Sequence, residues 1–177
     1  MQPLIQTYSG LYFDFKKPHI DQITIEDIAH ALANTCRYNG HCTHFYSVAQ
    51  HAVLVSQIVD EKFAWEALHH DDAEAYTGDV PTPLKQLIPQ FKKIEKRVEK
   101  VLAKKFKNPK ELSHEVKYAD LQALLIEKKC IMKVQDYWSC LDGINAPKID
   151  HVIPLPPELA ERLYLDRFNE LAEKFYK

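Results

Sequence analysis

The sequence predicts an all-α protein, a compact helical bundle, and three features of the chain support this prediction. Only four of the 177 residues are glycine, and segments of helix-forming residues alternate with short stretches of proline, asparagine and glycine. Apolar residues recur in those segments at helical spacing, and capping residues begin several of them. Because a chain of this length buries roughly 70% of the surface that its unfolded form exposes, we expect a single domain spanning residues 1–177.

Capping residues mark the first two expected helices. Thr24 can cap the first, with an acidic residue three positions later, and that helix should end before the Asn-Gly pair at 39–40. Ser47 and Gln50 form a capping box for the second, which places His51 in its first turn or just after it. The positions expected to face the core are Ile25, Ile28, Ala29 and Leu32 in the first helix and Val48, Ala52, Val55, Ile58 and Val59 in the second.

A third helix is expected from about Phe63 to Tyr76, and it should stop at Gly78, where a positive φ angle meets no steric penalty. A turn over residues 78–83 follows. Residues 136–156 are expected to form a loop, because proline, glycine and asparagine recur there. The last turns of the third helix would carry His69, His70, Asp71, Asp72 and Glu74, and further helices are predicted over residues 91–106, 113–134 and 157–175.

Composition limits the classes of partner and compartment. The formal net charge of −2 does not favour a stable complex with nucleic acid or with an anionic membrane. The lysines between residues 92 and 105 alternate with apolar positions and glutamates, which is typical of a solvated helix face. The chain starts without a signal-peptide pattern and has no run of about 18 apolar residues, so we expect a cytoplasmic protein. Four cysteines without a CxxC pair are expected to be reduced, and the apolar residues of the final helix suit the core or the contact of a homo-oligomer.

Histidine and aspartate residues supply the first indication of chemistry. His70 and Asp71 stand beside apolar residues on an expected helix, and burying such groups costs on the order of several kcal/mol unless they are paired or bind a metal. The dipeptide alone indicates little, because a partly exposed helix end explains most such pairs. His51 on the preceding helix and Asp120 on a later one change this, since three helices of a bundle can aim these groups at one point. Two imidazoles and two carboxylates suit Zn, Co, Mn, Fe or Ni, with Mg less favoured.

Four segments of the chain, in their order along the sequence, resemble the HD-domain phosphohydrolases. Within that family the chain resembles a small bacterial and phage branch that contains 5′-deoxynucleotidases and the dATP triphosphohydrolase DatZ. The resemblance covers about residues 9–130. The segments that carry it are CRYNGH at 36–41, FYSVAQH at 45–51, ALHHDDAEAYTGDVPTPLK at 67–85 and KYAD at 117–120. The resemblance implies an HD-domain helical fold and a divalent metal held by His51, His70, Asp71 and Asp120.

The same resemblance gives roles to two acidic residues. Glu74 lies four residues after His70, hence on the same face of the expected helix, where its carboxylate could orient or deprotonate the attacking water. Asp79 is the second candidate for water activation or for protonation of the leaving group. Each residue also has a structural alternative. Glu74 could support the metal ligands, and the side chain of Asp79 could stabilise the turn. His69 and Asp72 are interpreted as helix-surface residues or as supports of the ligands.

Three cations and one aromatic residue match substrate positions of the family. Arg37, Lys85 and Lys117 match positions that contact phosphate, where cations stabilise the charge of a phosphoryl transition state. Surface salt bridges are the alternative for these side chains. Tyr38 matches an aromatic residue that lies against the base. Gly40 departs from the dATP-specific relative, which has a bulky aliphatic residue near this position, so an adenine preference does not follow.

These residues predict hydrolysis of the 5′-phosphate ester of a deoxynucleotide, a small-molecule substrate. Three cations could bind more than one phosphate, so the sequence favours a dNTP triphosphohydrolase, dATP-like, that releases triphosphate. A 5′-deoxynucleotidase that releases orthophosphate from dNMPs is the alternative, because the two activities share one metal shell. A non-catalytic nucleotide-binding protein is a weaker alternative, since Glu74 and Asp79 are both present.

Overall fold

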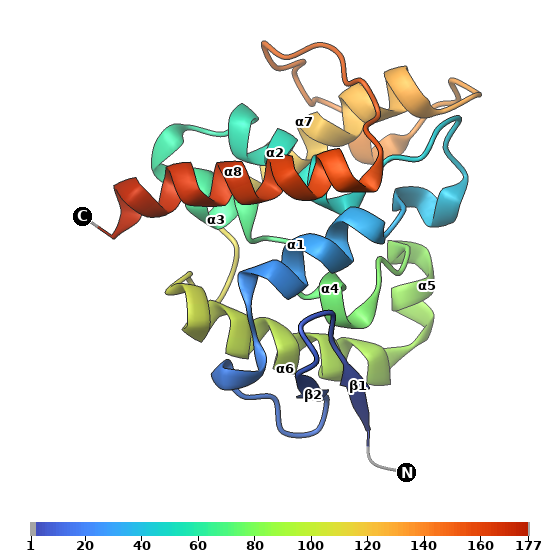
Figure 1. Ribbon diagram of the computed structural model, residues 1–177. Coiled ribbons are helices and arrows are strands. Elements are labelled where there is room, and N and C mark those ends of the chain that lie inside the picture. The colour runs from blue at the N-terminus through green and yellow to red at the C-terminus, as the bar shows by residue number, and fades with distance from the viewer. Residues whose placement is uncertain (1–2, 177) are drawn as a thin grey trace.

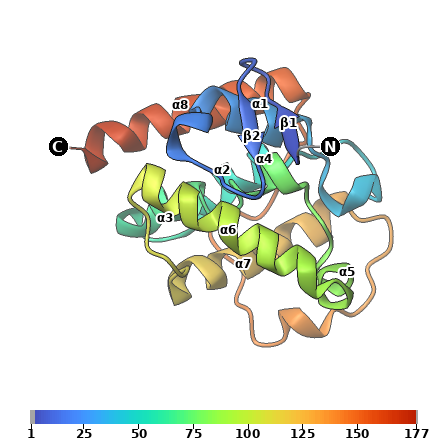
Figure 2. The same cartoon turned by 90° about the horizontal axis from the view of Figure 1, so that it is seen from below.

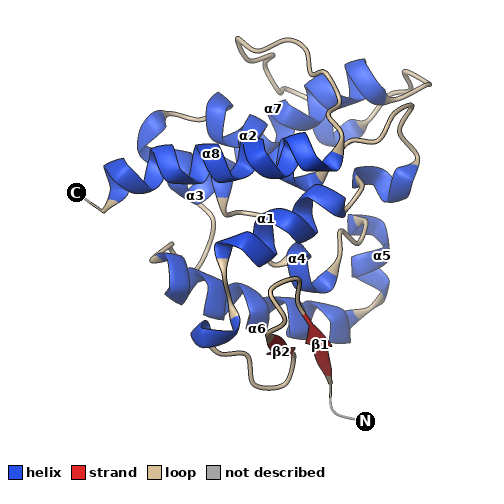
Figure 3. Ribbon diagram, in the orientation of Figure 1, coloured by secondary structure: helices blue, strands red, loops and turns tan. Residues whose placement is uncertain are grey.

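The backbone is mostly helical, and the all-α prediction is confirmed. The computed structural model describes residues 3–176. Within this part of the chain a short hairpin supplies the strands, and helices supply nearly all other regular structure (Figure 3). The strands are β1 (Leu4–Gln6) and β2 (Tyr12–Asp14), and the helices are α1 (Ile25–Asn34), α2 (Val48–Ile58), α3 (Ala64–Leu68), α4 (Glu74–Thr77), α5 (Thr82–Leu87), α6 (Pro89–Phe106), α7 (His114–Ile131) and α8 (Pro157–Phe175).

Helix α2 lies at the centre of the bundle. It packs against α1, α3, α7 and α8, and α8 also lies along α1 (Figure 1). Every residue of α2 from Val48 to Ser56 is buried, because the helix runs between two apolar clusters and contributes side chains to both. Burial stabilises this placement by roughly 25 cal/mol per Å² of apolar surface. His51 belongs to this buried stretch, so the core itself fixes its position.

The two expected caps, Thr24 and Ser47, begin α1 and α2, and Ser113 begins α7 in the same way. The hydroxyl oxygens of Thr24, Ser47 and Ser113 each accept a hydrogen bond from the backbone N–H three residues later, at 3.1, 3.1 and 3.3 Å. Gly78 follows α4 with φ 78°, as the sequence predicts for a glycine stop. Helix α8 has the predicted bounds of 157–175. Local hydrogen bonding therefore sets most helix ends.

One half of the predicted capping box is wrong. The side chain of Gln50 does not return to the start of α2, because it donates to the Ile153 carbonyl at 2.7 Å and accepts from Leu155 N–H at 3.0 Å. These two bonds satisfy backbone groups of the irregular segment that precedes α8. Gln50 therefore attaches this segment to the central helix.

The predicted helix over residues 63–76 is interrupted, which corrects the sequence-based prediction. Tight turns over residues 69–73 separate α3 from α4, and the N–H groups there bond mostly to carbonyls three residues back. The Ala67 carbonyl contacts both His70 N at 3.5 Å and His70 Nδ1 at 2.7 Å, so it is not available to the N–H of Asp71. Such local bonds from a side chain compete with the helical pattern. His70 and Asp71 consequently lie on turns rather than on a helix.

The hairpin and α5 are elements that the sequence pattern does not predict. β1 and β2 pair antiparallel and have three residues each, too few for a clear alternation of apolar and polar positions. Helix α5 occupies part of the expected turn and the residues after it. Helix α6 begins at Pro89, two residues earlier than predicted, because proline is well tolerated at the first helical position.

Helix α6 crosses the lower face of the molecule, and α5 packs at one end of it (Figure 2). Its buried residues are Val98, Val101, Leu102 and Phe106, which join the larger apolar cluster. The lysines between them are exposed, as the prediction of a solvated face requires. Within residues 3–176, no helix combines the length and the hydropathy that crossing a bilayer requires.

Candidate active site

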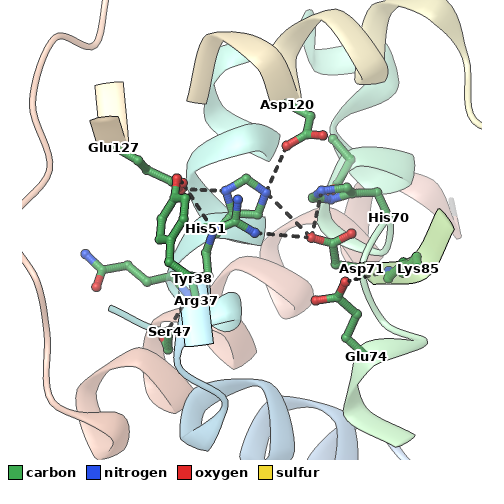
Figure 4. A network of polar contacts seen from close by, with 12 residues as sticks. Arg37, Tyr38, Ser47, His51, His70, Asp71, Glu74, Lys85, Asp120 and Glu127 are labelled. Carbon is green, nitrogen blue, oxygen red and sulfur yellow. Dashed lines mark hydrogen bonds and ion pairs between the residues drawn. The ribbon is translucent and has the colours of Figure 1, made fainter. Parts of the chain in front are cut away.

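Four side chains from three parts of the fold meet beside the central helix. His51 comes from α2, His70 and Asp71 from the turns between α3 and α4, and Asp120 from α7 (Figure 4). His51 Nε2 lies 3.1 Å from Asp120 Oδ1 and 3.6 Å from Asp71 Oδ2, and His70 Nε2 lies 3.2 Å from Asp71 Oδ2. Ligand atoms of His51, His70 and Asp120 all lie within 4.8 Å of one another. The structure thus brings the four predicted ligands together.

The two imidazoles fit a metal ion. Each uses Nδ1 inside the protein, since His51 Nδ1 lies 2.6 Å from Glu127 Oε1 and His70 Nδ1 lies 2.7 Å from the Ala67 carbonyl. Both partners accept hydrogen bonds, so Nδ1 carries a hydrogen and Nε2 can present its lone pair. Both Nε2 atoms are buried without a hydrogen-bond partner among the described residues. Such an unsatisfied group costs roughly 1–3 kcal/mol, and a shared cation removes that cost.

The charges of the site attract a cation to the same point. Burial lowers the pKa of His70, but the adjacent carboxylate of Asp71 outweighs burial and raises this pKa to about 9. Burial raises the pKa of Asp71, but the charge and hydrogen bond of His70, together with the charges of His51 and Arg37, outweigh burial and hold this pKa well below its usual range. A proton and a metal ion therefore compete for His70 Nε2, and we expect metal binding to release protons.

The ligand cluster opens to solvent on its carboxylate side. The side chain of Asp120 is 43% exposed and that of Asp71 is 21% exposed, whereas those of His51 and His70 are 0% and 3% exposed. The imidazoles therefore form the closed floor of the site and the carboxylates its mouth. A phosphate could reach a bound ion from the mouth without displacing core side chains.

Glu74 lies beside the ligands but not where the helical spacing predicts it. Because α4 starts at Glu74, this residue does not share one helix with His70, and the premise of a common helical face is wrong. Its Oε2 is buried without a hydrogen-bond partner among the described residues. Burial raises the pKa of Glu74, and the negative charges of Asp71 and Asp79 raise it further. A carboxyl group with a raised pKa is suited to proton transfer near neutral pH.

Asp79 also carries a raised pKa. Burial is the largest cause, the charge of Asp71 adds to it, and the charge of Arg37 opposes it. Asp79 follows Gly78 directly, past the end of α4, and the charges of Arg37, Asp71 and His51 all act on its carboxyl group. The negative charge of Asp79 thus disfavours ionisation of the Glu74 carboxyl group. This arrangement supplies one group that can hold a proton and one that can accept it.

The predicted phosphate-binding lysines differ in their surroundings. Lys85 Nζ lies 2.6 Å from Glu95 Oε1 and 3.4 Å from Glu74 Oε1, so two carboxylates already balance its charge. Lys117 is exposed and stands one helical turn before Asp120 on α7. It lines a cavity of about 660 Å³ whose wall also includes His70. The surface-salt-bridge alternative therefore describes Lys85 in part, while Lys117 forms no ion pair with the residues 3–176 that the structure describes.

Glu127 is the site residue that the sequence analysis misses. Its carboxylate is fully buried, and Oε2 accepts from Arg37 Nε at 3.1 Å and from the Tyr38 hydroxyl at 2.6 Å, while Oε1 contacts His51 (Figure 4). Burial raises the pKa of Glu127, but the charges of Arg37 and His51 outweigh burial and lower this pKa to about 2. A signal for it existed, because Glu127 follows Asp120 by seven residues, which places both on one helix face.

His69 and Asp72 are buried, so their interpretation as helix-surface residues is wrong. His69 Nδ1 lies 2.6 Å from Asp72 Oδ2, and Asp72 Oδ1 accepts from the Tyr164 hydroxyl at 2.6 Å. Because Tyr164 belongs to α8, this chain of contacts attaches the ligand-bearing turns to the C-terminal helix. The alternative reading of His69 and Asp72, as supports of the ligands, agrees with these contacts.

Comparison with known proteins identifies the family. The model of the family described as 5′-deoxynucleotidase YfbR-like matches residues 29–146, which include every predicted site residue and Glu127. The chain belongs to the YfbR-like 5′-deoxynucleotidase family. As a YfbR-like protein it is an HD-domain phosphohydrolase, and the resemblance seen in the sequence is confirmed. The family implies a divalent metal, for which His51, His70 and Asp120 provide a candidate site.

Individual relatives of this YfbR-like chain differ in how much of it they cover. It is 46% identical over 170 residues to the Escherichia coli K12 protein named uncharacterized protein YfdR, an alignment that covers 96% of each chain. It is 40% identical over 89 residues to an uncharacterized Rhodobacter capsulatus protein, which covers 45% of each. It is 31% identical over 110 residues to a 5′-deoxynucleotidase of Yersinia pestis, over 58% of this chain and 56% of that one. A nucleotide phosphohydrolase is the general class that these relatives support.

Proposed function

We propose that this YfbR-like chain is a metal-dependent 5′-deoxynucleotidase, which releases orthophosphate from deoxynucleoside 5′-monophosphates. One observation carries the proposal, namely that two buried imidazole Nε2 atoms without hydrogen-bond partners face the carboxylates of Asp71 and Asp120. This cluster lies beside Glu74, whose carboxyl group has a raised pKa. The Yersinia relatives named 5′-deoxynucleotidases support the choice of substrate class.

The site favours one phosphate over three, which reverses the preference drawn from the sequence. That preference rested on three free cations. In the structure, two carboxylates balance Lys85, and Arg37 directs its Nε to Glu127. The remaining end of the Arg37 guanidinium lies 3.7 Å from Asp71 Oδ2, close enough to the ligands to contact a single phosphate there. Less positive charge is therefore free for a long phosphate chain than the sequence suggests.

The residues of the site divide into four roles under this proposal. A divalent ion, for which we propose Zn, Co, Mn, Fe or Ni over Mg, would supply Lewis acidity toward a phosphate oxygen when held by the four ligands. Glu74 orients the attacking water and accepts its proton, and Asp79 is the second candidate for water activation or for protonation of the departing 5′ oxygen of the nucleoside. Arg37 binds the phosphate, and Tyr38 lies against the base.

The surroundings of Lys117 support a second candidate function, that of a dNTP triphosphohydrolase. Lys117 is an exposed cation one turn from Asp120, and the cavity that it lines reaches His70. Lys96 and Lys100 of α6 line the same cavity. A triphosphate that extended into this cavity would meet four lysines, Lys96, Lys100, Lys110 and Lys117, whereas a monophosphate at the ligands would reach only Lys117.

Product analysis distinguishes the two candidates. The purified protein is incubated with matched dNMPs, NMPs and dNTPs in Mn²⁺, Co²⁺ or Zn²⁺, and the released orthophosphate and triphosphate are quantified. We expect orthophosphate from dNMPs, no product after removal of metal with a chelator, and restored activity when metal is returned. In ¹⁸O-labelled water the label should enter the orthophosphate, because water attacks phosphorus. Triphosphate released from dNTPs, with dNMPs untouched, would replace the proposal by the second candidate.

A further inference from the structure

We propose that Glu127 is a positioning residue that serves both halves of the site, because one carboxylate orients the ligand His51 and the substrate residues Arg37 and Tyr38. It contacts them at 2.6, 3.1 and 2.6 Å respectively. Glu127 contacts His51 at Nδ1, whereas Nε2 of the same ring faces Asp71 and Asp120, so Glu127 stands behind the ligand rather than among the ligand atoms. The inference has two parts. The metal half concerns the contact of Glu127 with His51 and does not depend on the proposed function. The substrate half concerns its contacts with Arg37 and Tyr38 and rests on the proposed function.

The metal half follows from the tautomer of His51. Glu127 Oε1 is a carboxylate oxygen, which only accepts, so His51 must carry its hydrogen on Nδ1 and present Nε2 toward Asp71 and Asp120. A carboxylate behind an imidazole also makes Nε2 a more basic ligand. Because both side chains are fully buried, water cannot substitute for this partner. Loss of the carboxylate should therefore weaken metal binding although no ligand is removed.

The substrate half follows from the segment Arg37–Gly40. Tyr38 and Asn39 both adopt left-handed backbone angles, with φ of 56° and 50°. Such angles cost a non-glycine residue roughly 1–2 kcal/mol and persist where surrounding contacts hold them. Glu127 Oε2 supplies two of these contacts, and the bond from Arg37 N to the Tyr46 carbonyl at 2.9 Å supplies another. Glu127 therefore holds in place the two side chains expected to bind phosphate and base.

Glu127→Gln is the main test, because an amide has the same shape but offers one acceptor oxygen and two donor hydrogens. Whichever way the amide turns, it places an N–H group against a donor of His51 or against Arg37 and Tyr38. We measure Co²⁺ affinity by competition with a chelator, without substrate, and follow the visible spectrum of bound Co²⁺. We expect the affinity to fall by roughly 10- to 100-fold. At saturating Co²⁺ we expect KM for a dNMP to rise by roughly 2- to 10-fold, since a positioning contact is lost.

Three further variants separate positioning from folding. Glu127→Asp keeps the charge and should recover part of the Co²⁺ affinity. Tyr38→Phe removes one of the three contacts and should raise KM while Co²⁺ affinity stays at the wild-type value. Glu115→Gln, on the exposed face of the same helix, is the matched control and should change neither quantity. Circular dichroism confirms that each variant is folded.

The outcomes address the two halves separately. Unchanged Co²⁺ affinity and an unchanged spectrum in folded Glu127→Gln would overturn the metal half. If the glutamine variant does not fold, the same two measurements on Glu127→Asp replace it, and wild-type values for both would overturn the metal half. A KM at saturating Co²⁺ that neither Glu127→Gln nor Tyr38→Phe alters would overturn the substrate half. If the wild type binds Co²⁺ in a Glu127-dependent way but hydrolyses no deoxynucleotide, the proposed function fails while the metal half stands.

Discussion

Replacing Glu74 by glutamine should abolish most turnover without loss of metal. The predicted ligand cluster consists of His51, His70, Asp71 and Asp120, and Glu74 is not part of it. Its Oε1 lies 3.4 Å from Lys85 Nζ, a contact that the amide oxygen of glutamine can keep, while Oε2 has no hydrogen-bond partner in the described part of the chain. The substitution therefore removes proton acceptance and little else.

The expected loss in kcat is roughly 10²- to 10⁴-fold, the usual contribution of a general base. Steady-state kinetics with a dNMP, together with metal analysis of the purified variant, measure it. Glu95→Gln is the matched control, because Glu95 contacts Lys85 from the other side at 2.6 Å and lies on α6. It should keep kcat within about 3-fold of the wild type. A metal content that falls with kcat in Glu74→Gln would show that Glu74 supports the ligands instead.

The pH profile gives a second check on Glu74. Burial, Asp71 and Asp79 raise its pKa, so the carboxylate needed as a base is lost as pH falls through a value above the ordinary glutamate pKa of about 4.3. The wild-type kcat profile should therefore show an acid limb that lies above this ordinary value. The limb should disappear in Glu74→Gln, whose residual activity has no such group to protonate. An acid limb that persists unchanged in the variant would assign it to another residue.

Three other perturbations test different parts of the structure. Asp71→Ala should abolish turnover and weaken Co²⁺ binding by more than roughly 100-fold, because a ligand is lost, and a variant with wild-type metal content and activity would refute that role. Lys85→Ala or Lys117→Ala should lower kcat/KM for a dNMP and a dNTP by the same factor, whereas a loss of roughly 10-fold or more confined to the dNTP, about 1.5–3 kcal/mol, would favour a triphosphate. Asp27→Asn should lower the free energy of unfolding at pH 7 by about 1–2 kcal/mol. Burial raises the pKa of Asp27, but hydrogen bonds from Ser9 outweigh burial and lower it, so this stability is present above the unfolded-state pKa and lost as pH falls through the lower folded-state pKa. Urea denaturation should accordingly show a smaller difference between Asp27→Asn and the wild type at acid pH than at pH 7.

Features that depend on a few neighbouring residues could be read from the sequence. A hydroxyl at Thr24, Ser47 or Ser113 bonds to an N–H three residues away, so it marks a helix start whatever the rest of the fold does. The same holds for the glycine stop at Gly78. The helical period predicted the core-facing residues of α1, and the alternation of helix-forming segments with proline, asparagine and glycine predicted the fold class.

The identity of the predicted ligands was also accessible, because His51, the His70-Asp71 pair and Asp120 stand in recognisable segments. The backbone conformation of His70 and Asp71, however, could not be predicted from the sequence. The helix expected through residues 63–76 breaks into turns because the imidazole of His70 takes the Ala67 carbonyl, a choice that depends on where the imidazole must point. Periodicity does not record the direction in which a single side chain is held.

The tertiary structure alone decided which charged groups are free and which are already paired. Lys85 and Glu95 lie ten residues apart, and Glu127 lies 90 residues from Arg37 and 76 from His51, yet these residues meet at hydrogen-bond distances. The sequence determined that cations and carboxylates were available for a phosphate and a metal. Packing of α2 against α7 determined that one buried carboxylate, that of Glu127, contacts His51, Arg37 and Tyr38 together, because a charge removed from water must find partners wherever the fold supplies them.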